Sequence, residues 1–366
     1  MEGRLYLDVH VIQTVPPSCV NRDDTGSPKT AIYGGVRRAR VSSQSWKRAV
    51  RAYFKENSGD MLGIRTAHVV EMVADAISAK DQTVPRDVAM EKAAAVFEAG
   101  KISIKSKKIK DKEEVDCSAA LMFVSRLQIN LLANLALSPD FAASEAKAQK
   151  AAVNDILDNN NTADIILFGR MLADDPSLNV DATCQVAHAI STHRVDNEYD
   201  YYTAVDEMNL DDTSGAGMIG TVEFNSSTLY RYATLAVHEL ANQMTEKSDI
   251  LRTVTEFVKA FVLSMPTGKQ NTFANRTVPD AVLLVLRKDQ PVNLVGAFEV
   301  PVKAGSEGYA LPSAKRLTEY MSEVCSSFVC PAEKTWQIGK GLDGAGAPTG
   351  LTEALEDISR CIDSEI

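Results

Sequence analysis

The sequence predicts an α+β protein, a sheet interrupted by a long and mainly helical insertion. Three observations support this fold class. Residues 5–13 alternate between apolar and more polar side chains, as a half-buried strand does. Residues 247–264 place apolar side chains on one stripe of a helix. Residues 281–286 form a continuous apolar run, which is typical of a central strand.

A helix follows the first strand after a long loop. Ser42 or Ser43 makes a suitable N-cap for it. Apolar residues then recur at i, i+3, i+4, i+7 and i+8, which predicts one buried face. These residues are Trp46, Ala49, Val50, Tyr53 and Phe54. The other face carries basic residues near a helix start whose free N–H groups attract anions. They are Lys47, Arg48, Arg51 and Lys55.

The insertion, residues 57 to about 192, looks mainly helical. We expect helices over residues 88–99, closed by Gly100, and over about 141–157. The most apolar run, residues 117–137, contains charged and amide side chains, so a buried helix is predicted there and not a membrane span. Residues 101–112 carry six lysines and few aromatic side chains, which indicates a mobile loop.

A long hairpin is predicted after the insertion. Residues 198–208 are strand-like and aromatic, 209–220 form a tip rich in Asp, Gly and Ser, and 221–224 and 229–233 return as strands. Protruding elements of this kind usually contact something. The tail from Pro312 onward is expected to be mainly helical, with a break at residues 339–350.

Without insertions, the element order is strand, helix, strand, strand, helix, strand. This is the ferredoxin-like order that RRM modules share. The aromatic RNP1 signature of a standard RRM is absent from the sequence. The order therefore predicts the fold of such a module and does not assign its usual base-stacking surface.

Composition places the chain among ordinary globular proteins. Its 366 residues, 45% hydrophobic and 24% charged, suffice for one large or two modest domains. No signal-peptide apolar region follows Met1. The six cysteines lack CxxC spacing, so neither a zinc site nor a disulfide framework is indicated. We expect a cytoplasmic protein without a cofactor, a bound metal or a membrane contact.

Charge is sorted unevenly along the sequence. The chain has a formal net charge of −10, yet residues 25–51 contain seven basic residues and no acidic one. A basic loop that leads into a basic helix start suits a phosphate backbone. The acidic remainder argues against nonspecific nucleic-acid binding over the whole surface. A solvated basic face is the alternative interpretation of the same charges.

Several short segments, in order from about residue 9 to about residue 280, match one protein family. They are Pro17–Cys19, Asn21–Asp24, Lys29, Ala31–Gly35, Arg37–Arg38, Arg40–Ser45, Lys47–Ala49, Arg65–Thr66, His68, Gly169–Met171, Ala187–Ile190, Thr192–His193, Thr203–Asp206, Tyr230–Ala233 and Lys269–Gln270. Together they resemble the CasC-type (Cas7-class) backbone subunit of the type I-E CRISPR Cascade complex. The helical middle and the C-terminal tail match less well.

The resemblance implies a subunit shaped like a right hand. An RRM-like palm would comprise residues 1–56 and 221–366, helical fingers residues 57–192, and a hairpin thumb residues 193–220. Several copies would stack along one CRISPR guide RNA and present it for pairing with a target DNA strand. Further partners implied are the large, small, guide-capping and guide-processing subunits of Cascade.

The resemblance also implies which residues contact nucleic acid. The guide-RNA contacts would be Arg22, Lys29, Arg38, Arg40, Ser42, Ser43, Gln44, Lys47, Arg48, Arg51, Arg170, Met171, Lys269 and Gln270. Met171 would act as an apolar wedge against a displaced base. Lysines of the insertion would contact target DNA, namely Lys105, Lys107, Lys108, Lys147 and Lys150.

A nuclease is the alternative from another functional class. Asp23 and Asp24 follow the first strand in a loop, where type III relatives carry a catalytic aspartate, and adjacent carboxylates can help to hold a divalent metal. The same loop suits an Asx turn with an internal Arg–Asp pair equally well. A ribonuclease using His10 or His68 is a further alternative. We predict a non-catalytic protein.

The remaining aromatic and histidine candidates have structural interpretations. Tyr6 and His10 could stack on bases, but core or cross-strand packing is the favoured interpretation. His188 and His193 are five residues apart and would not share a helix face for metal binding. We therefore predict that both of these histidines are structural.

Overall fold

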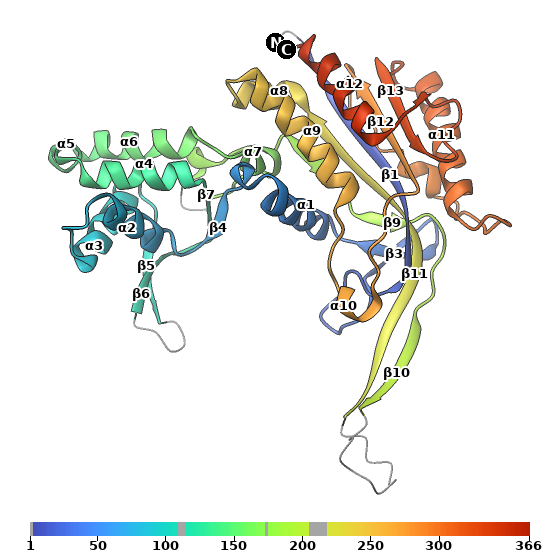
Figure 1. Cartoon of the computed structure of the whole chain (residues 1–366), viewed down its shortest axis with the longest axis horizontal. Coiled ribbons are helices and arrows are strands. Elements are labelled where there is room, and N and C mark those ends of the chain that lie inside the picture. Colours follow the sequence, from blue (N-terminus) through green and yellow to red (C-terminus); the bar gives the residue numbers. More distant parts are fainter. Residues whose placement is uncertain (1–2, 109–113, 173–174, 205–217) are drawn as a thin grey trace, which may run out of the picture. The chain divides into compact units, whose positions relative to one another are not determined.

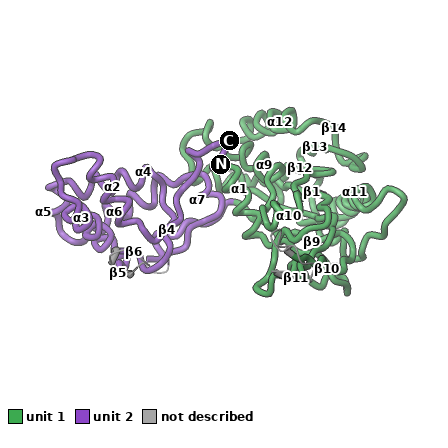
Figure 2. Tube along the Cα trace, turned by 60° about the horizontal axis from the view of Figure 1, so that its bottom comes forward, with its two compact units in different colours: residues 1–53, 184–366 green, residues 54–183 purple. Residues whose placement is uncertain are grey.

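The computed structural model describes residues 3–108, 114–172, 175–204 and 218–366. The chain divides into two compact units (Figure 2). Unit 1 comprises residues 1–53 and 184–366, and unit 2 comprises residues 54–183. Unit 2 overlaps the insertion that the sequence predicts over residues 57–192.

Unit 1 is built on a mixed sheet that combines antiparallel pairs with one parallel pair. Its main path runs β14-β13-β12-β1-β11-β9-β3-β2, and β8 and β10 also pair with β11. The strands are β1 (Tyr6–Ser18), β2 (Thr30–Tyr33), β3 (Val36–Val41), β8 (Cys184–Val186), β9 (Ala189–Ser191), β10 (Glu198–Ala204), β11 (Met218–Ala236), β12 (Ala281–Arg287), β13 (Lys334–Gly339) and β14 (Ala347–Pro348). The protein is therefore a mixed α/β structure with a central sheet.

The three elements that predicted the fold class are present. The first strand is β1, which pairs antiparallel with both β11 and β12. The apolar run is β12, in which every residue is buried. The amphipathic stripe is α9 (Lys247–Leu263). The predicted hairpin is β10 paired with β11, but its returning arm is one continuous strand instead of two. Residues 205–217 of its tip lie outside the described residues.

Helices cover both faces of the sheet in unit 1 (Figure 1). On one face, the guanidinium of Arg231 from β11 lies 3.8 Å from the ring centre of Trp46 and 4.7 Å from that of Phe261. Because Trp46 belongs to α1 (Ser43–Asn57) and Phe261 to α9, this cation holds both helices against the sheet. On the other face, η3 (Leu294–Phe298) and α11 (Ala310–Ser327) pack on β1, β11 and β12.

The remaining helices of unit 1 are α8 (Val237–Gln243), α10 (Gln270–Phe273) and α12 (Leu351–Asp363). The expectation of a mainly helical tail is only partly correct, because the tail also supplies β13 to the sheet beside β12. α12 is fastened to β13 by a hydrogen bond of 2.7 Å from the indole nitrogen of Trp336 to Asp357.

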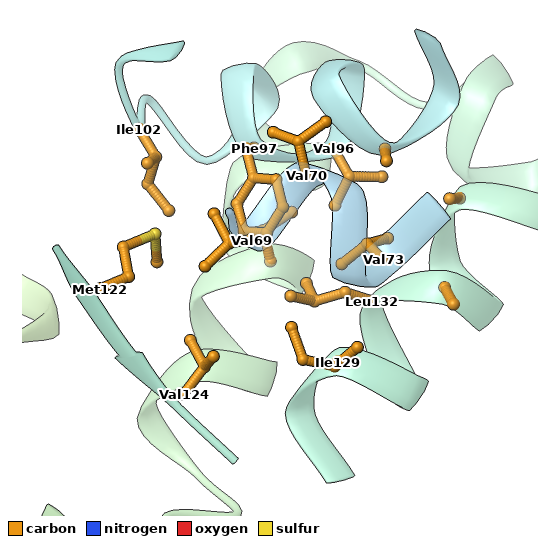
Figure 3. Packing of buried hydrophobic residues seen from close by; sticks show 14 of the residues in the cluster. Val69, Val70, Val73, Val96, Phe97, Ile102, Met122, Val124, Ile129 and Leu132 are labelled. Carbon is orange, nitrogen blue, oxygen red and sulfur yellow. The ribbon is translucent and has the colours of Figure 1, made fainter. Parts of the chain in front are cut away.

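Unit 2 is a helical cluster with short strands. Its helices are α2 (Val69–Lys80), α3 (Arg86–Ala99), α4 (Arg126–Leu137), α5 (Pro139–Ala143), α6 (Ala146–Asp158) and α7 (Ala163–Phe168), with η1 (Gly59–Met61) and η2 (Pro176–Leu178). Strand pairs are β4 (Ile64–Thr66) with β7 (Met122–Val124), and β5 (Ile104–Lys108) with β6 (Glu114–Ser118). The core, with Val69, Phe97 and Leu132 among its members, is shown in Figure 3.

Three predictions in this unit need correction. Residues 117–137 are not one helix, because Ser125 and Gln128 form a capping box that starts α4 at Arg126. The helix expected over 141–157 is divided into α5 and α6. Residues 104–108 form a strand and not a loop, because residues 114–118 supply its partner, which lysine content did not reveal.

No helix in the described part of the chain is long and apolar enough to cross a membrane. All six cysteines are free in the structure. Among the described residues, no group of three or more His, Cys, Asp or Glu side chains is placed to hold a metal ion.

Candidate nucleic-acid interface

The start of α1 is held by side chains from two other segments of unit 1. Ser42 is the N-cap, since its Oγ accepts the N–H of Ser45 at 3.4 Å. The Oδ1 of Asn21 accepts the N–H of Ser42 at 2.9 Å. The Nδ1 of His188 accepts the N–H of Ser43 at 3.1 Å. Three early N–H groups of the helix therefore have acceptors within the protein.

This arrangement corrects one part of the sequence argument. The free N–H groups expected to attract anions at residues 42, 43 and 45 are already satisfied. Ser42 is also buried, so it serves as a cap and is not exposed to a ligand. An anion at this end of α1 would be bound chiefly by side chains.

The loop of residues 21–29 places two cations beside the start of α1. The N–H of Lys29 donates to the carbonyl of Asn21 at 2.8 Å, and the N–H of Arg40 donates to the carbonyl of Lys29 at 2.9 Å. The Nε of Arg40 donates to the carbonyl of Thr30 at 3.4 Å. The side chains of Lys29 and Arg40 are half-buried and remain partly accessible.

His188 lies beside Lys29 and Arg40 at the start of α1, a position that the sequence did not predict. Partial burial, followed by the charges of Arg40 and Lys29, lowers the pKa of its imidazole. Because Nδ1 accepts the N–H of Ser43, the hydrogen of the neutral ring is on Nε2. His188 therefore has the structural role that was predicted, but at the edge of the basic region. His193 is buried, and its Nε2 accepts the N–H of Thr228 at 3.0 Å.

A second turn brings two further predicted residues to the same loop. A Cβ on Gly268 would lie 2.0 Å from the carbonyl oxygen of Val20, so only glycine permits this close approach. The next residue, Lys269, has φ of +48° and precedes Gln270. The charges of Lys269 and Arg22 both act on the Cys19 thiol, whose pKa burial raises.

On α1, Gln44 and Arg48 are exposed, and Lys47 and Arg51 are half-buried. Positions 44, 47, 48 and 51 are three or four apart and lie on one side of the helix. We call the following residues the basic cradle: Arg22, Lys29, Arg40, Ser43, Gln44, Lys47, Arg48, Arg51, Lys269 and Gln270.

Arg38 was predicted to contact RNA, but the structure places it in the interior. Its side chain is fully buried. Its guanidinium donates to the carbonyls of Tyr33 (3.1 Å), Ser191 (3.1 Å), Phe298 (2.8 Å) and Glu299 (3.3 Å). Burial lowers the pKa of this guanidinium. Arg38 therefore stabilises the turn between β2 and β3, and we remove it from the set of contacts.

In unit 2, the Gly169–Met171 segment shows a division of roles. Arg170 is buried, and donates to the carbonyls of Leu178 at 2.9 Å and Leu157 at 2.8 Å, so it too supports the fold. Its main chain pairs with that of Val180. The next side chain, Met171, is 83% exposed. The arginine thus fixes a turn that presents an apolar side chain to the outside.

The lysines predicted to contact DNA differ in accessibility. Lys105 on β5 and Lys147 on α6 are exposed. Lys150 forms an ion pair of 2.8 Å with Asp175. That ion pair lowers the pKa of the Asp175 carboxyl group to about 2. The side chains of Lys107 and Lys108 lie outside the described residues.

The loop carboxylates favour the turn interpretation. The Oδ1 of Asp23 accepts the N–H of Thr25 at 3.0 Å, the hydroxyl of Thr25 at 2.7 Å and the N–H of Ser27 at 3.1 Å, which forms an Asx turn. The hydroxyl bond lowers the pKa of this carboxyl group. Asp24 is exposed.

His10 and His68, the two histidines considered for a ribonuclease, lie in different surroundings. His10 is buried, with Nδ1 2.9 Å from the hydroxyl of Tyr230, and its ring stacks on that of Tyr232 at 5.1 Å. Burial lowers the pKa of His10 to about 3. The prediction of core packing is thus confirmed for His10, while Tyr6 packs edge-on against His238. His68 lies 3.4 Å from Glu71 in unit 2.

The chain is similar over nearly its whole length to proteins in solved RNA-guided complexes. One chain of a "CRISPR RNA-guided surveillance complex, pre-nicking" has a TM-score of 0.84 and 32% sequence identity, over 97% of this chain and 99% of that chain. A chain of another "CRISPR RNA-guided surveillance complex" has a TM-score of 0.75 and 29% identity, over the same shares. No curated protein matches the chain.

Fold and sequence together thus define a Cas7-like class of protein, as the sequence motifs indicated. Residues 7–361 match the family model of the CT1975-like proteins, and the chain belongs to that family.

Proposed function

We propose that this protein is a non-catalytic backbone subunit of the CasC type, which binds CRISPR guide RNA in a type I-E Cascade complex. The basic cradle carries this proposal, because it gathers cations and amide groups from the 21–29 loop, α1 and the 267–270 turn in one unit of an otherwise acidic chain. Such a set suits sugar-phosphate, which is bound without regard to base sequence.

The architecture supports the proposed assignment of palm, fingers and thumb. The strand order β12-β1-β11-β9, with α1 and α9 against one face, is consistent with a ferredoxin-like palm. Unit 2 corresponds to the fingers. The β10–β11 hairpin corresponds to the thumb and exposes the aromatic rings of Tyr199 and Tyr201.

In the proposed assembly, copies of this chain line one guide RNA together with the other Cascade subunits in the cytoplasm. The cradle binds backbone phosphates, and Met171 supplies the apolar wedge beside a displaced base. Lys105 and Lys147 are the accessible candidates for contact with the target DNA strand. Sequence recognition is left to base pairing between guide and target.

The first test is whether the protein purified from cells expressing a guide carries RNA, and of what length. The second is the variant Lys47→Ala/Arg51→Ala, which should weaken binding equally for RNAs of different sequence. The slope of log affinity against log salt should also fall by about 1.4, the value for two contacts to a single strand. An unchanged slope would remove these two residues from the interface.

The thumb assignment has its own test. Deletion of residues 209–217, which leaves the paired residues of β10 and β11 in place, should leave the thermal unfolding of the chain unchanged but shorten its assemblies on a long RNA, measured by electron microscopy. Full-length assemblies formed by the deletion variant would refute a role for this segment in stacking.

The absence of catalysis is also part of the proposal. RNA incubated with the protein and Mg²⁺ or Mn²⁺ should remain intact, because the Asx turn engages one oxygen of the Asp23 carboxylate in hydrogen bonds within the loop. Metal-dependent cleavage that is lost in Asp23→Ala or Asp24→Ala would instead establish the endoribonuclease alternative.

A further inference from the structure

A small cavity lies beside the cradle in unit 1. Its volume is about 20 Å³, which is room for one water-sized group and too little for a base or a whole phosphate. Its lining combines apolar and polar side chains, and includes Lys29 and Arg40 of the cradle. The residues are Val15, Ser18, Val20, Asn21, Pro28, Lys29, Ala39, Arg40, Val41, Asn225, Ser227 and Leu229.

The cavity forms where the pairing of β1 with β11 is interrupted. Val15 pairs with Ser227, and the next pair is Ser18 with Asn225. Two residues of β1, Pro16 and Pro17, thus oppose one residue of β11, and a proline has no N–H to donate to the ladder. The bulge separates the strands at the level of the cradle.

Two buried polar side chains of β11 keep unused hydrogen-bonding capacity at this cavity. Ser227 is only 7% exposed, and its hydroxyl has no partner in the described part of the chain. Asn225 is 6% exposed, and its Nδ2 donates to Asn197 at 3.2 Å. The Oδ1 of Asn225 is the acceptor that remains, because no described group donates to it.

A relay of hydrogen bonds fixes the orientation of that amide. The carboxylate of Glu223 can only accept, so Asn197 donates its Nδ2 to it, at 3.1 Å. The Oδ1 of Asn197 must then accept, and Asn225 donates to it. The Asn225 oxygen consequently keeps its capacity to accept, and Asn225 lines the cavity together with Ser227, whose hydroxyl can donate or accept.

The Asn225 oxygen and the Ser227 hydroxyl determine which chemical group can bind in the cavity. A phosphate oxygen only accepts, so Asn225 Oδ1 would repel it. A hydroxyl can donate to Asn225 and accept from Ser227 at the same time. The cations beside the cavity favour a hydroxyl that is attached to a phosphate-bearing chain.

We propose that this cavity receives a ribose 2′-hydroxyl of the bound guide, and that Ser227 and Asn225 thereby make the subunit selective for RNA over DNA. The inference rests on the proposed guide-RNA function. It adds a reader of the sugar to a cradle that binds phosphate, since the 2′-hydroxyl is the group by which a protein distinguishes the two polymers.

The experiment uses the full chain and one single-stranded sequence in three forms, RNA, DNA and 2′-O-methyl RNA, at one salt concentration. The wild type should bind RNA about fivefold or more tighter than either of the others, which corresponds to at least one neutral hydrogen bond. Ser227→Ala should lose that preference through weaker RNA binding, while its affinity for DNA stays unchanged.

Arg48→Ala is the matched control, because Arg48 is an exposed cradle residue of α1 that does not line the cavity. It should weaken RNA and DNA binding by the same factor and keep the RNA preference, because it removes a phosphate contact only. Equal melting temperatures of wild type and Ser227→Ala show that the variant is folded.

The possible failures are distinguishable. If RNA binds with its salt dependence intact but Ser227→Ala weakens RNA and DNA equally, or if 2′-O-methyl RNA binds the wild type as tightly as RNA, the sugar reader is overturned and the backbone function stands. If neither RNA nor DNA binds, both proposals fail.

Discussion

The basic cradle and the interior of the sheet beside it both hold basic side chains, but the two regions use them for different purposes. In the cradle, Arg22 and Arg48 are exposed. In the interior, Arg38 and Arg231 are fully buried and bind protein acceptors. Arg37 and Arg38 are neighbours in β3, yet the first is exposed and the second is buried. Tertiary packing, and not local charge density, decides which cations a polymer can reach, because Arg38 and Arg40 lie on the same face of β3 and only Arg38 is fully buried.

This comparison has a simple consequence for mutagenesis. Substitutions in the interior should reduce the free energy of unfolding and leave the RNA affinity of the folded protein unchanged. Substitutions in the cradle should weaken RNA binding and leave the free energy of unfolding unchanged. Residues at the boundary, such as His188, should affect both properties slightly.

The largest effect is expected for Arg38→Met. It removes the donor from four main-chain carbonyls and leaves buried acceptors unsatisfied, which should cost about 3 kcal/mol or more of unfolding free energy. Arg37→Ala is the matched control and should change stability by less than about 0.5 kcal/mol. Denaturant titration measures both. Equal stability of the two variants would contradict the assignment of Arg38 to the interior.

The second prediction concerns Asp8, whose carboxylate accepts the hydroxyl of Tyr232 at 2.9 Å and the N–H of Val292 at 2.9 Å. Burial raises the pKa of Asp8 to about 6, despite those bonds. The raised pKa means that the folded state binds the proton more tightly. The associated stability is fully present below about pH 4 and is lost as the pH rises through about 6, by roughly 3 kcal/mol in total.

Asp8→Asn should remove this pH dependence, although the variant is less stable at low pH because an amide has only one acceptor oxygen for two donors. The measurement is the difference in unfolding free energy between wild type and variant from pH 4 to pH 7. A difference that stays constant over this range would contradict the buried carboxyl group.

The smallest effect is expected at His188. His188→Ala removes the acceptor of the Ser43 N–H and should raise the dissociation constant for RNA about threefold to tenfold, the effect of a lost helix cap on a site built around that helix. His188→Asn can place an amide oxygen near the position of Nδ1 and should change the constant less than about twofold. If His188→Asn raises the dissociation constant as much as His188→Ala does, the assignment of His188 as a cap of α1 is wrong.

Low pH should weaken RNA binding by the wild type, as His188→Ala does. Because the pKa of His188 is lowered in the folded protein, its capping bond persists below the ordinary imidazole pKa and is lost only as the pH falls through the lowered pKa of the folded state. RNA binding by the wild type at low pH should therefore lose the contribution that His188→Ala has already lost.

The sequence predicts elements whose pattern is local. The alternation in β1, the apolar run of β12 and the stripes of α1 and α9 each follow from a short window of residues. It misses what depends on a distant partner. β5 is a strand because of residues 114–118, and β13 joins a tail that was expected to be mainly helical because β12 offers it an edge.

The residues of the candidate site also fall into those that the sequence predicts and those that depend on a distant partner. Charge counting found Lys29, Arg40 and the outer face of α1, all of which come together in one unit. It could not distinguish Arg38 from Arg37, or find that His188, about 145 residues away, caps α1. Nor could it show that Gly268 closes on Val20 and brings Lys269 to the loop. These are facts of tertiary packing.

One measurement tests the central claim most directly: the salt dependence of RNA binding by two double variants. Lys29→Ala/Arg40→Ala alters the cradle, and Lys105→Ala/Lys147→Ala removes the same number of charges from unit 2. The account predicts that the cradle variant lowers the slope of log affinity against log salt by about 1.4, the value for two contacts to a single strand, and that the unit 2 variant leaves it unchanged. Equal slopes for the two variants would contradict it.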